Sequence, residues 1–179
     1  MTDISASYAQ ALYSLAKEEN LTENLLQQLQ SLQTVFTEEP KFQQLLALPG
    51  ISKQERCQIL DDCLRDKAHP YVLNFLKILT EKGYIRHFGS CVKAYEETYN
   101  TDNGIVTVLA VTAVALTDAQ TDRLRAKLEQ VTGKTVKLNN RIDPTCLGGV
   151  RLDFDGKRVD GTVKNKLDAL RSQLNNTVL

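Results

Sequence analysis

The sequence has little of what enzymes and metalloproteins use for chemistry. It contains no tryptophan, one methionine and two histidines, His69 and His87, and none of its four cysteines forms a Cys-x-x-Cys pair. Metal-ligand spacing is therefore absent. We expect the cysteines to be reduced, buried and structural, and the histidines to be surface or capping residues. Since no base accompanies a serine or cysteine nucleophile, the sequence predicts no metal, no cofactor and no catalytic residue.

Phosphate loops and excess positive charge are missing as well. No Gly-x4-Gly-Lys-Ser/Thr motif occurs, and Gly148-Gly149 precede a predicted strand instead of joining a strand to a helix. Gly161-Thr162 precede a predicted helix, which we interpret as a tight turn with a threonine cap. The 22 basic and 22 acidic residues give zero formal charge, which argues against nucleic acid as the main partner.

No hydrophobic run is long enough to cross a membrane. The longest candidate, residues 105–116, is well short of the roughly 20 apolar residues that a span requires, and it contains threonines. The N-terminus lacks a basic region followed by an apolar run, and it does not look like a transit peptide. We therefore expect no direct membrane insertion and a bacterial origin, with a peripheral location at the cytoplasmic face of the inner membrane.

The first hundred residues show helical periodicity instead. Apolar residues recur every three or four positions, and turn residues separate the repeats. The first helix is predicted from Ile4 to about Glu19, and a loop over 100–104 closes the set. The other helix starts are predicted at a Thr22 cap, at Pro40, at a Ser52-x-x-Glu55 capping box, at Pro70 and near Ile85.

Two of these helices carry more apolar surface than one core contact needs. The first has one stripe of Tyr8, Leu12 and Leu15, and a second stripe of small or aromatic residues that includes Ala9 and Ala16. The helix after Pro70 is apolar on nearly all sides. Either both helices are simply buried among their neighbours, or some of their side chains face outward and line a groove that accepts another helix.

The period changes after Gly104. Residues 105–116 read as a buried strand, a Thr117-x-x-Gln120 capping box opens a helix, and Gly133 is placed to end it. Alternating segments then predict strands at 135–139, 150–154 and 157–159, with an Asp155-Gly156 hairpin turn. A last helix is predicted to bury Val163, Leu167, Leu170 and Leu174 on one side. The β-α-β-β-β-α order is typical of a small mixed α/β domain.

The predicted fold class is therefore α+β, with an N-terminal six-helix bundle followed by a small mixed α/β domain. We place the boundary between residues 1–103 and 104–179. Residues 1–103 hold ten basic and fourteen acidic residues, whereas residues 104–179 hold twelve and eight. This asymmetry suggests that the two domains have different neighbours.

Several segments, in order along the whole chain, resemble one family. The run Leu147-Gly148-Gly149-Val150-Arg151-Leu152, followed by Asp160-Gly161-Thr162-Val163 and Leu167, resembles the C-terminal signature of the delta subunit of F-type ATP synthases. The mitochondrial member of that family is the oligomycin-sensitivity-conferring protein. Tyr8 to Ala16 is similar to the first helix of the family, and Asn74 to Leu79 with Glu81-Lys82-Gly83 is similar to its fifth.

The resemblance implies a non-catalytic stator, or peripheral-stalk, subunit that links the catalytic head to the membrane sector, present in one copy per complex. Its N-terminal domain would receive the N-terminal helix of an alpha subunit between the first and fifth helices. Its C-terminal domain would hold the C-termini of b-type stalk subunits. The expected groove residues are Tyr8, Ala9, Leu12, Leu15, Ala16, Phe75 and Leu79. The signature residues Gly148, Gly149, Val150, Asp160, Gly161, Thr162, Val163 and Leu167 are expected to be structural.

Two other function classes stand beside this one. A helical RNA-binding or regulatory protein would show a basic face and affinity that falls steeply with salt. A small-molecule enzyme would show a cleft with convergent titratable groups, and the sequence nominates no such set.

Overall fold

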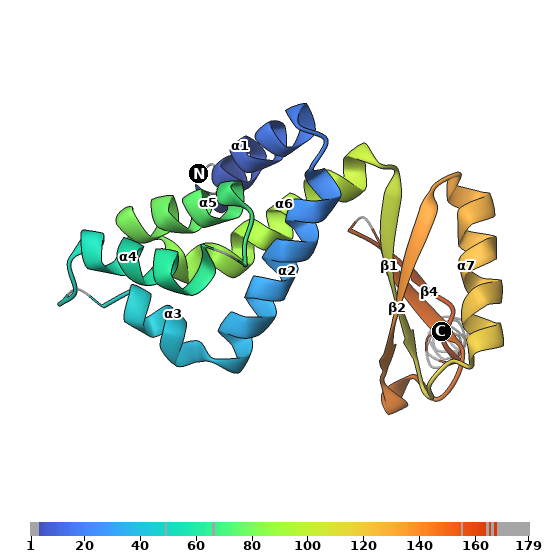
Figure 1. The fold of residues 1–179 in the computed structure, drawn as a ribbon. Coiled ribbons are helices and arrows are strands. Elements are labelled where there is room, and N and C mark those ends of the chain that lie inside the picture. Colours follow the sequence, from blue (N-terminus) through green and yellow to red (C-terminus); the bar gives the residue numbers. More distant parts are fainter. Residues whose placement is uncertain are drawn as a thin grey trace, which may run out of the picture. The chain divides into compact units, whose positions relative to one another are not determined.

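The computed structural model describes residues 4–48, 50–65, 67–154, 156–163, 165 and 167. The chain divides into two units, Met1–Tyr99 and Asn100–Leu179. Figure 1 shows helices alone in the first unit and a sheet with helical cover in the second, which confirms the α+β class. Within the described residues, no helix is both long enough and apolar enough to cross a membrane.

The first unit is built from helices joined by short turns. In chain order they are α1 (Ile4–Glu18), α2 (Thr22–Glu38), α3 (Pro40–Leu46), α4 (Lys53–Leu64), α5 (Pro70–Glu81), the 3₁₀ turn η1 (Ile85–His87) and α6 (Phe88–Asp102). The capping box at Ser52 and Glu55 is present, and Pro40 and Pro70 occupy first turns, as predicted. The predicted turn residue Pro49 lies outside the described residues.

Two predicted helix boundaries are wrong. Thr22 is not a cap but the first residue of α2, because Asn20 at φ 57° ends α1 and Leu21 serves as the N-cap without a side-chain bond. The expected loop at 100–104 begins later, because α6 continues through Asp102 before Gly104 turns the chain at φ 63°.

The core of the first unit joins residues far apart in the sequence. Tyr95 of α6 is fully buried, meets the Tyr13 ring edge-on at 5.3 Å, and its hydroxyl lies 3.1 Å from the carbonyl of Thr22. Phe88 contacts Phe36 in the same manner at 5.1 Å. Each such side chain stabilises the fold by about 1.5–3 kcal/mol relative to exposure. Aromatic contacts therefore tie α1 and α2 to α6.

Helix α4 differs from its predicted burial. Only Arg56 and Leu60 are buried on it, while Cys63 is exposed and Cys57 half-buried. The prediction that all four cysteines are buried is wrong for this pair, because the buried face of α4 is narrow and follows Arg56 and Leu60. Cys91 and Cys146 are buried as expected.

The second unit is a mixed four-stranded sheet with α7 on one face. Strand β1 (Ile105–Thr112) lies parallel to β2 (Thr135–Ile142) and antiparallel to β3 (Val150–Phe154), which pairs with β4 (Lys157–Asp160), giving the order β2-β1-β3-β4 (Figure 1). Helix α7 (Asp118–Thr132) follows β1, and the 3₁₀ turn η2 (Pro144–Cys146) follows β2. Val106, Val108 and Val136 form the buried centre.

Most local signals in this unit act as predicted. The Thr117–Gln120 capping box opens α7, and Gly133 ends it in the left-handed conformation. Strand β1 is shorter than expected and ends at Thr112, whose hydroxyl lies 2.6 Å from the carbonyl of Val114. Of the predicted last helix, Val163 and Leu167 are helical, whereas Leu170, Leu174 and the turn residue Asp155 lie outside the described residues.

Candidate helix-binding cleft

An apolar cleft of about 320 Å³ lies between α1 and α5. Its walls repeat one spacing, because the residues of each helix stand at i, i+3, i+4 and i+7 and so share one helical face. This cleft lining consists of Tyr8, Ala11, Leu12 and Leu15 from α1, and Tyr71, Asn74, Phe75 and Ile78 from α5. No charged side chain belongs to the lining.

The floor of the cleft is part of the buried core, and its rim is open to solvent. Leu12 and Phe75 are 5% and 6% exposed and belong to the core of the unit. Leu15 and Ile78 are 48% and 44% exposed, although both are aliphatic. A surface that keeps such residues in water is typical of a contact site for another protein.

Neighbouring groups hold the two tyrosines in place. The ring of Tyr8 contacts that of Tyr84, with centroids 6.1 Å apart. Tyr71 stands in the first turn of α5, where its backbone N–H donates to Nδ1 of the capping residue His69 at 3.3 Å. The backbone N–H of His69 donates in turn to Gln28 of α2 at 2.7 Å. The tyrosine at each end of the cleft is thus held by contacts within its own unit.

Four of the seven expected groove residues line the cleft: Tyr8, Leu12, Leu15 and Phe75. Ala9, Ala16 and Leu79 do not, because they are 1%, 0% and 0% exposed and face the interior of their own unit. A charge at Leu79 would therefore enter the core, so Leu79→Asp cannot test partner binding.

Sequence reasoning missed the other half of the lining, namely Ala11, Tyr71, Asn74 and Ile78. The signal was available in the spacing, since Tyr71, Asn74, Phe75 and Ile78 repeat the pattern of Tyr8, Ala11, Leu12 and Leu15. This spacing did not identify the lining, because α5 is apolar on both faces and periodicity alone does not show which face is buried.

A second cleft, between α4 and α5, is polar. Lys77 pairs with Asp61 at 2.6 Å, and the Cys57 thiol lies 3.8 Å from Oε1 of Glu81. Burial, followed by the negative charge of Glu81, raises the pKa of Cys57 above its usual range. A raised pKa disfavours the thiolate, so this cysteine is not an activated nucleophile.

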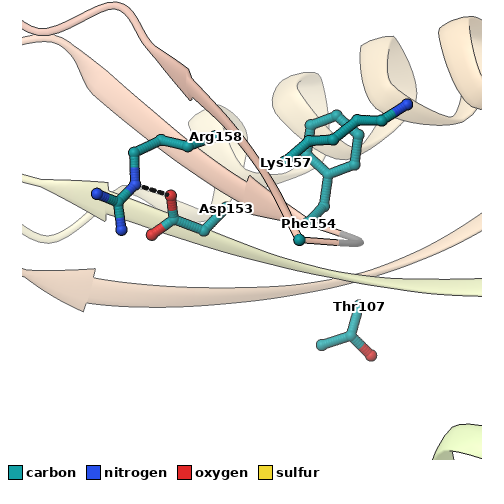
Figure 2. Close-up of a pocket in the computed structure, with 6 residues that line it drawn as sticks. Thr107, Asp153, Phe154, Lys157 and Arg158 are labelled. Atoms are coloured by element: carbon teal, nitrogen blue, oxygen red, sulfur yellow. Dashed lines mark hydrogen bonds and ion pairs between the residues drawn. The ribbon is translucent and has the colours of Figure 1, made fainter.

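A third cleft lies beside the β3–β4 hairpin and contains paired charges. Figure 2 shows the carboxylate of Asp153 facing Arg158, whose Nε lies 2.8 Å from Oδ1, with Thr107 of β1 below them. Nε of Arg151 approaches the other oxygen of Asp153 at 3.5 Å. The single carboxylate is held by two guanidinium groups, and Lys157 adds a further positive charge to the lining, so the cleft has an excess of positive charge and its carboxylate is not free to act as a general base. No group of three potential metal ligands occurs among the residues that the structure describes.

The glycine-rich segments 148–150 and 160–163 lie against each other. The backbone N–H of Gly161 donates to Val150, and that of Val163 donates to Gly148, both at 3.0 Å. A Cβ on Gly149 would lie 2.6 Å from the carbonyl oxygen of Gly161. Close backbone approach therefore explains Gly149, and also Gly161, where a Cβ would lie 3.1 Å from the carbonyl oxygen of Val150.

Asp160 and Thr162 fix the turn that follows. Oδ1 of Asp160 accepts from the backbone N–H and the hydroxyl of Thr162, at 2.9 and 2.7 Å. The Thr162 hydroxyl also accepts from the backbone N–H of Asn165, so it acts as the predicted threonine cap. These side-chain and backbone bonds, in that order, lower the pKa of Asp160.

Comparison with known proteins decides the family. The family model described as "ATP synthase delta (OSCP) subunit" matches residues 4–174. The chain belongs to this family. An ATP synthase subunit delta of Alkaliphilus oremlandii is 34% identical over 96% of this chain and 95% of that protein. One of Clostridioides difficile is 31% identical over 98% and 97%.

A solved structure shares this fold. A chain in the cryo-EM structure of the Toxoplasma gondii mitochondrial ATP synthase hexamer aligns with a TM-score of 0.76 and 21% identity, over 97% of this chain and 98% of that one. As a delta (OSCP) family member, the chain is a non-catalytic peripheral-stalk subunit of an F-type ATP synthase. The RNA-binding alternative receives no support.

Proposed function

We propose that the cleft between α1 and α5 binds the N-terminal helix of an alpha subunit and so fixes residues 1–103, acting as one six-helix bundle, to the catalytic head. The observation that carries the proposal is the uncharged cleft lining with two exposed aliphatic residues at its rim. An amphipathic helix placed there would bury them, which is the usual way a helix is held in a groove.

Shape and size support a helix as the ligand. From Tyr8 to Leu15 and from Tyr71 to Ile78, each wall comprises eight residues, whose seven steps span about 10 Å of helix. Two turns of a partner helix fit this length and would present apolar residues with the same three- and four-residue spacing. A stator needs such a hold because it resists torque without catalysing a reaction.

The rim residues provide the test. Leu15→Asp and Ile78→Asp place a carboxylate in the contact, and each should weaken binding of a synthetic alpha N-terminal helix at least tenfold, or about 1.4 kcal/mol. Titration calorimetry on the full chain measures this. Gln10→Asp is the matched control, because Gln10 is exposed on α1 but does not line the cleft. Unchanged affinity in both rim variants would refute the cleft as the binding site.

The second unit, residues 104–179, binds the C-termini of b-type stalk subunits in this proposal. Several apolar side chains stay exposed where β1 and β2 end: Val114, Ile142, Leu147 and Val163 are 74%, 54%, 69% and 44% exposed. Thr112 pairs with Ile142 at that end, and Val163 bonds to Gly148 beside Leu147. The two sequence relatives named above are from bacteria, so we place the chain at the cytoplasmic face of the inner membrane. We also propose one copy per complex, as the family resemblance implies.

A substitution at Leu147 can test binding of the b-type subunit without lowering the stability of the unit. It adopts φ 60°, a conformation that asparagine tolerates better than leucine. Leu147→Asn should therefore leave the unit equally or more stable, yet weaken capture of the b-type subunit at least tenfold. Thermal unfolding and pull-down of the full chain measure the two effects. Val131→Asn is the control, since Val131 is 85% exposed at the end of α7. Full binding by the Leu147 variant would exclude this surface.

A further inference from the structure

One polar side chain interrupts the otherwise apolar α5 wall of the cleft. Asn74 stands three residues after Tyr71 and four before Ile78, so it lies between them on the same helical face. The residue with the same sequence spacing on the α1 wall, three positions after Tyr8, is Ala11, which is small and apolar. Asn74 is exposed, and its carboxamide makes no hydrogen bond within the part of the chain that the structure describes.

A carboxamide in this place has a consequence for any helix that fills the cleft. It carries two donors and two lone pairs, and water serves them while the cleft is open. A helix seated between α1 and α5 would displace that water. Unless the helix brings its own donor or acceptor to the same spot, the carboxamide is left unpaired, which weakens binding.

We propose that Asn74 is a specificity-determining residue that selects the register of the incoming helix. The helix is amphipathic, with apolar residues for the rim and floor and one polar side chain, placed within its apolar face, that pairs with Asn74. This inference rests on the helix-binding function proposed above. A single buried asparagine sets register in coiled coils in the same way, at some loss of affinity.

The other residues of the cleft lining show why selection of the helix register would depend on Asn74. Every other lining residue is aliphatic or aromatic, so sliding the helix by one turn would exchange one apolar contact for another. Only Asn74 distinguishes the two registers by chemistry. Tyr8 and Tyr71 are half-buried and lie at opposite ends of the cleft, because Tyr8 contacts Tyr84 beyond the end of α5 whereas Tyr71 stands in its first turn, so neither marks the middle.

The experiment is a double-mutant cycle by titration calorimetry on the full chain. The probe is a synthetic alpha N-terminal helix and a series of its variants, each with one polar residue changed to alanine. With wild type, one alanine variant should bind at least fivefold more weakly. With Asn74→Leu, the same variant should bind as well as the parent peptide, because no carboxamide remains to be paired.

Asn74→Leu should also bind a peptide with leucine at the coupled position about tenfold more tightly than wild type does. Gln10→Leu adds the same apolar surface outside the cleft and should change no affinity. Because Asn74 is exposed, neither variant should change the thermal midpoint of the free chain.

The possible failures are distinguishable. If wild type binds the parent peptide and no peptide position couples to Asn74, register selection is excluded while the helix-binding function stands. If wild type fails to bind the parent peptide at all, the proposed function fails, and this inference fails with it.

Discussion

Two adjacent residues on α5 differ sharply in solvent exposure. Ile78 is 44% exposed at the cleft rim, whereas Leu79 is completely buried in the core of the unit. Both are aliphatic, so composition does not distinguish them, but a rotation of about 100° per residue places them on different faces. Substitution at Ile78 therefore reports on binding, and substitution at Leu79 reports on stability.

A single hydrogen bond also involves the buried, positively charged side chain of Arg56. Arg56 is 9% exposed, and its Nη1 lies 3.0 Å from the carbonyl oxygen of Leu46 at the end of α3. A positive charge is favourable at a helix C-terminus, where carbonyl groups lack intrahelical partners. Arg56 thereby ties α3 to α4.

Asp160 gives a pH-dependent prediction. Its pKa is lowered in the folded chain, so its stabilising contribution is present above the ordinary carboxyl pKa of 3.8 and is lost as the pH falls through the lowered value. Thr162→Val removes the hydroxyl donor and should raise the pKa of Asp160 toward 3.8. Carbon-detected NMR titration of the carboxyl groups measures the change.

Asp143 supplies the internal control for that titration. Its Oδ1 accepts from the backbone N–H and hydroxyl of Thr145 at 3.0 and 2.6 Å, the same arrangement at another turn, and its pKa is also lowered. Thr162→Val should leave the pKa of Asp143 unchanged. An Asp160 pKa that does not move in the variant would contradict the assigned cause.

Among the elements, the β3–β4 hairpin and the segments beside it depend on glycine in two different ways. Gly149 has φ 80° and almost touches the backbone of Gly161, whereas Gly156 has φ 71° and open space around it. The first position excludes a side chain by contact as well as by conformation. The second requires only the left-handed conformation that glycine adopts easily.

This difference predicts unequal effects of the same substitution. Gly149→Ala should destabilise the second unit by about 3 kcal/mol, because backbone must move to admit the methyl group. Gly156→Ala should cost only about 1 kcal/mol. Hydrogen exchange of the β1 and β3 amides in the full chain measures the loss of protection. Equal losses in the two variants would contradict the close-approach explanation.

Helices α4 and α7 show how local signals fix element boundaries. Each begins with a reciprocal capping box, at Ser52–Glu55 and at Thr117–Gln120. The bonds are short-range and form regardless of the tertiary context, which is why the sequence predicted both starts correctly. The start of α2 has no such side-chain cap, and there the prediction was wrong by one residue.

On the scale of the whole molecule, each of the two units has an exposed apolar surface. The first presents a cleft with uncharged lining, and the second presents exposed aliphatic residues at one end of its sheet. Neither surface brings titratable groups together for catalysis. If each unit binds one partner, as proposed, the chain acts as a linker.

The uncharged cleft lining predicts weak salt dependence. Binding of the alpha N-terminal helix to the full chain should change less than about threefold between 50 and 500 mM salt, and its heat-capacity change should be negative, because apolar burial drives it. A nucleic-acid contact would lose about a thousandfold or more over a smaller range. Titration calorimetry at several salt concentrations measures both quantities, and a steep salt slope would contradict an apolar contact.

The sequence by itself determined the element types, most of the boundaries and the family. Periodicity, caps and glycine turns act over a few residues, so they can be read without knowing what packs against them. The absence of phosphate loops, metal-ligand spacing and nucleophile–base pairs likewise pointed away from catalysis.

Only the tertiary structure decided which face of each helix is free. Ala9, Ala16 and Leu79 were expected in the groove and lie in the core, while Tyr71 and Ile78 were not expected there and line it. The physical reason is that α5 is apolar around most of its circumference, so both faces satisfy the same pattern. Which one is buried depends on where α1 and the other helices pack, and that is set by contacts between residues distant in the chain.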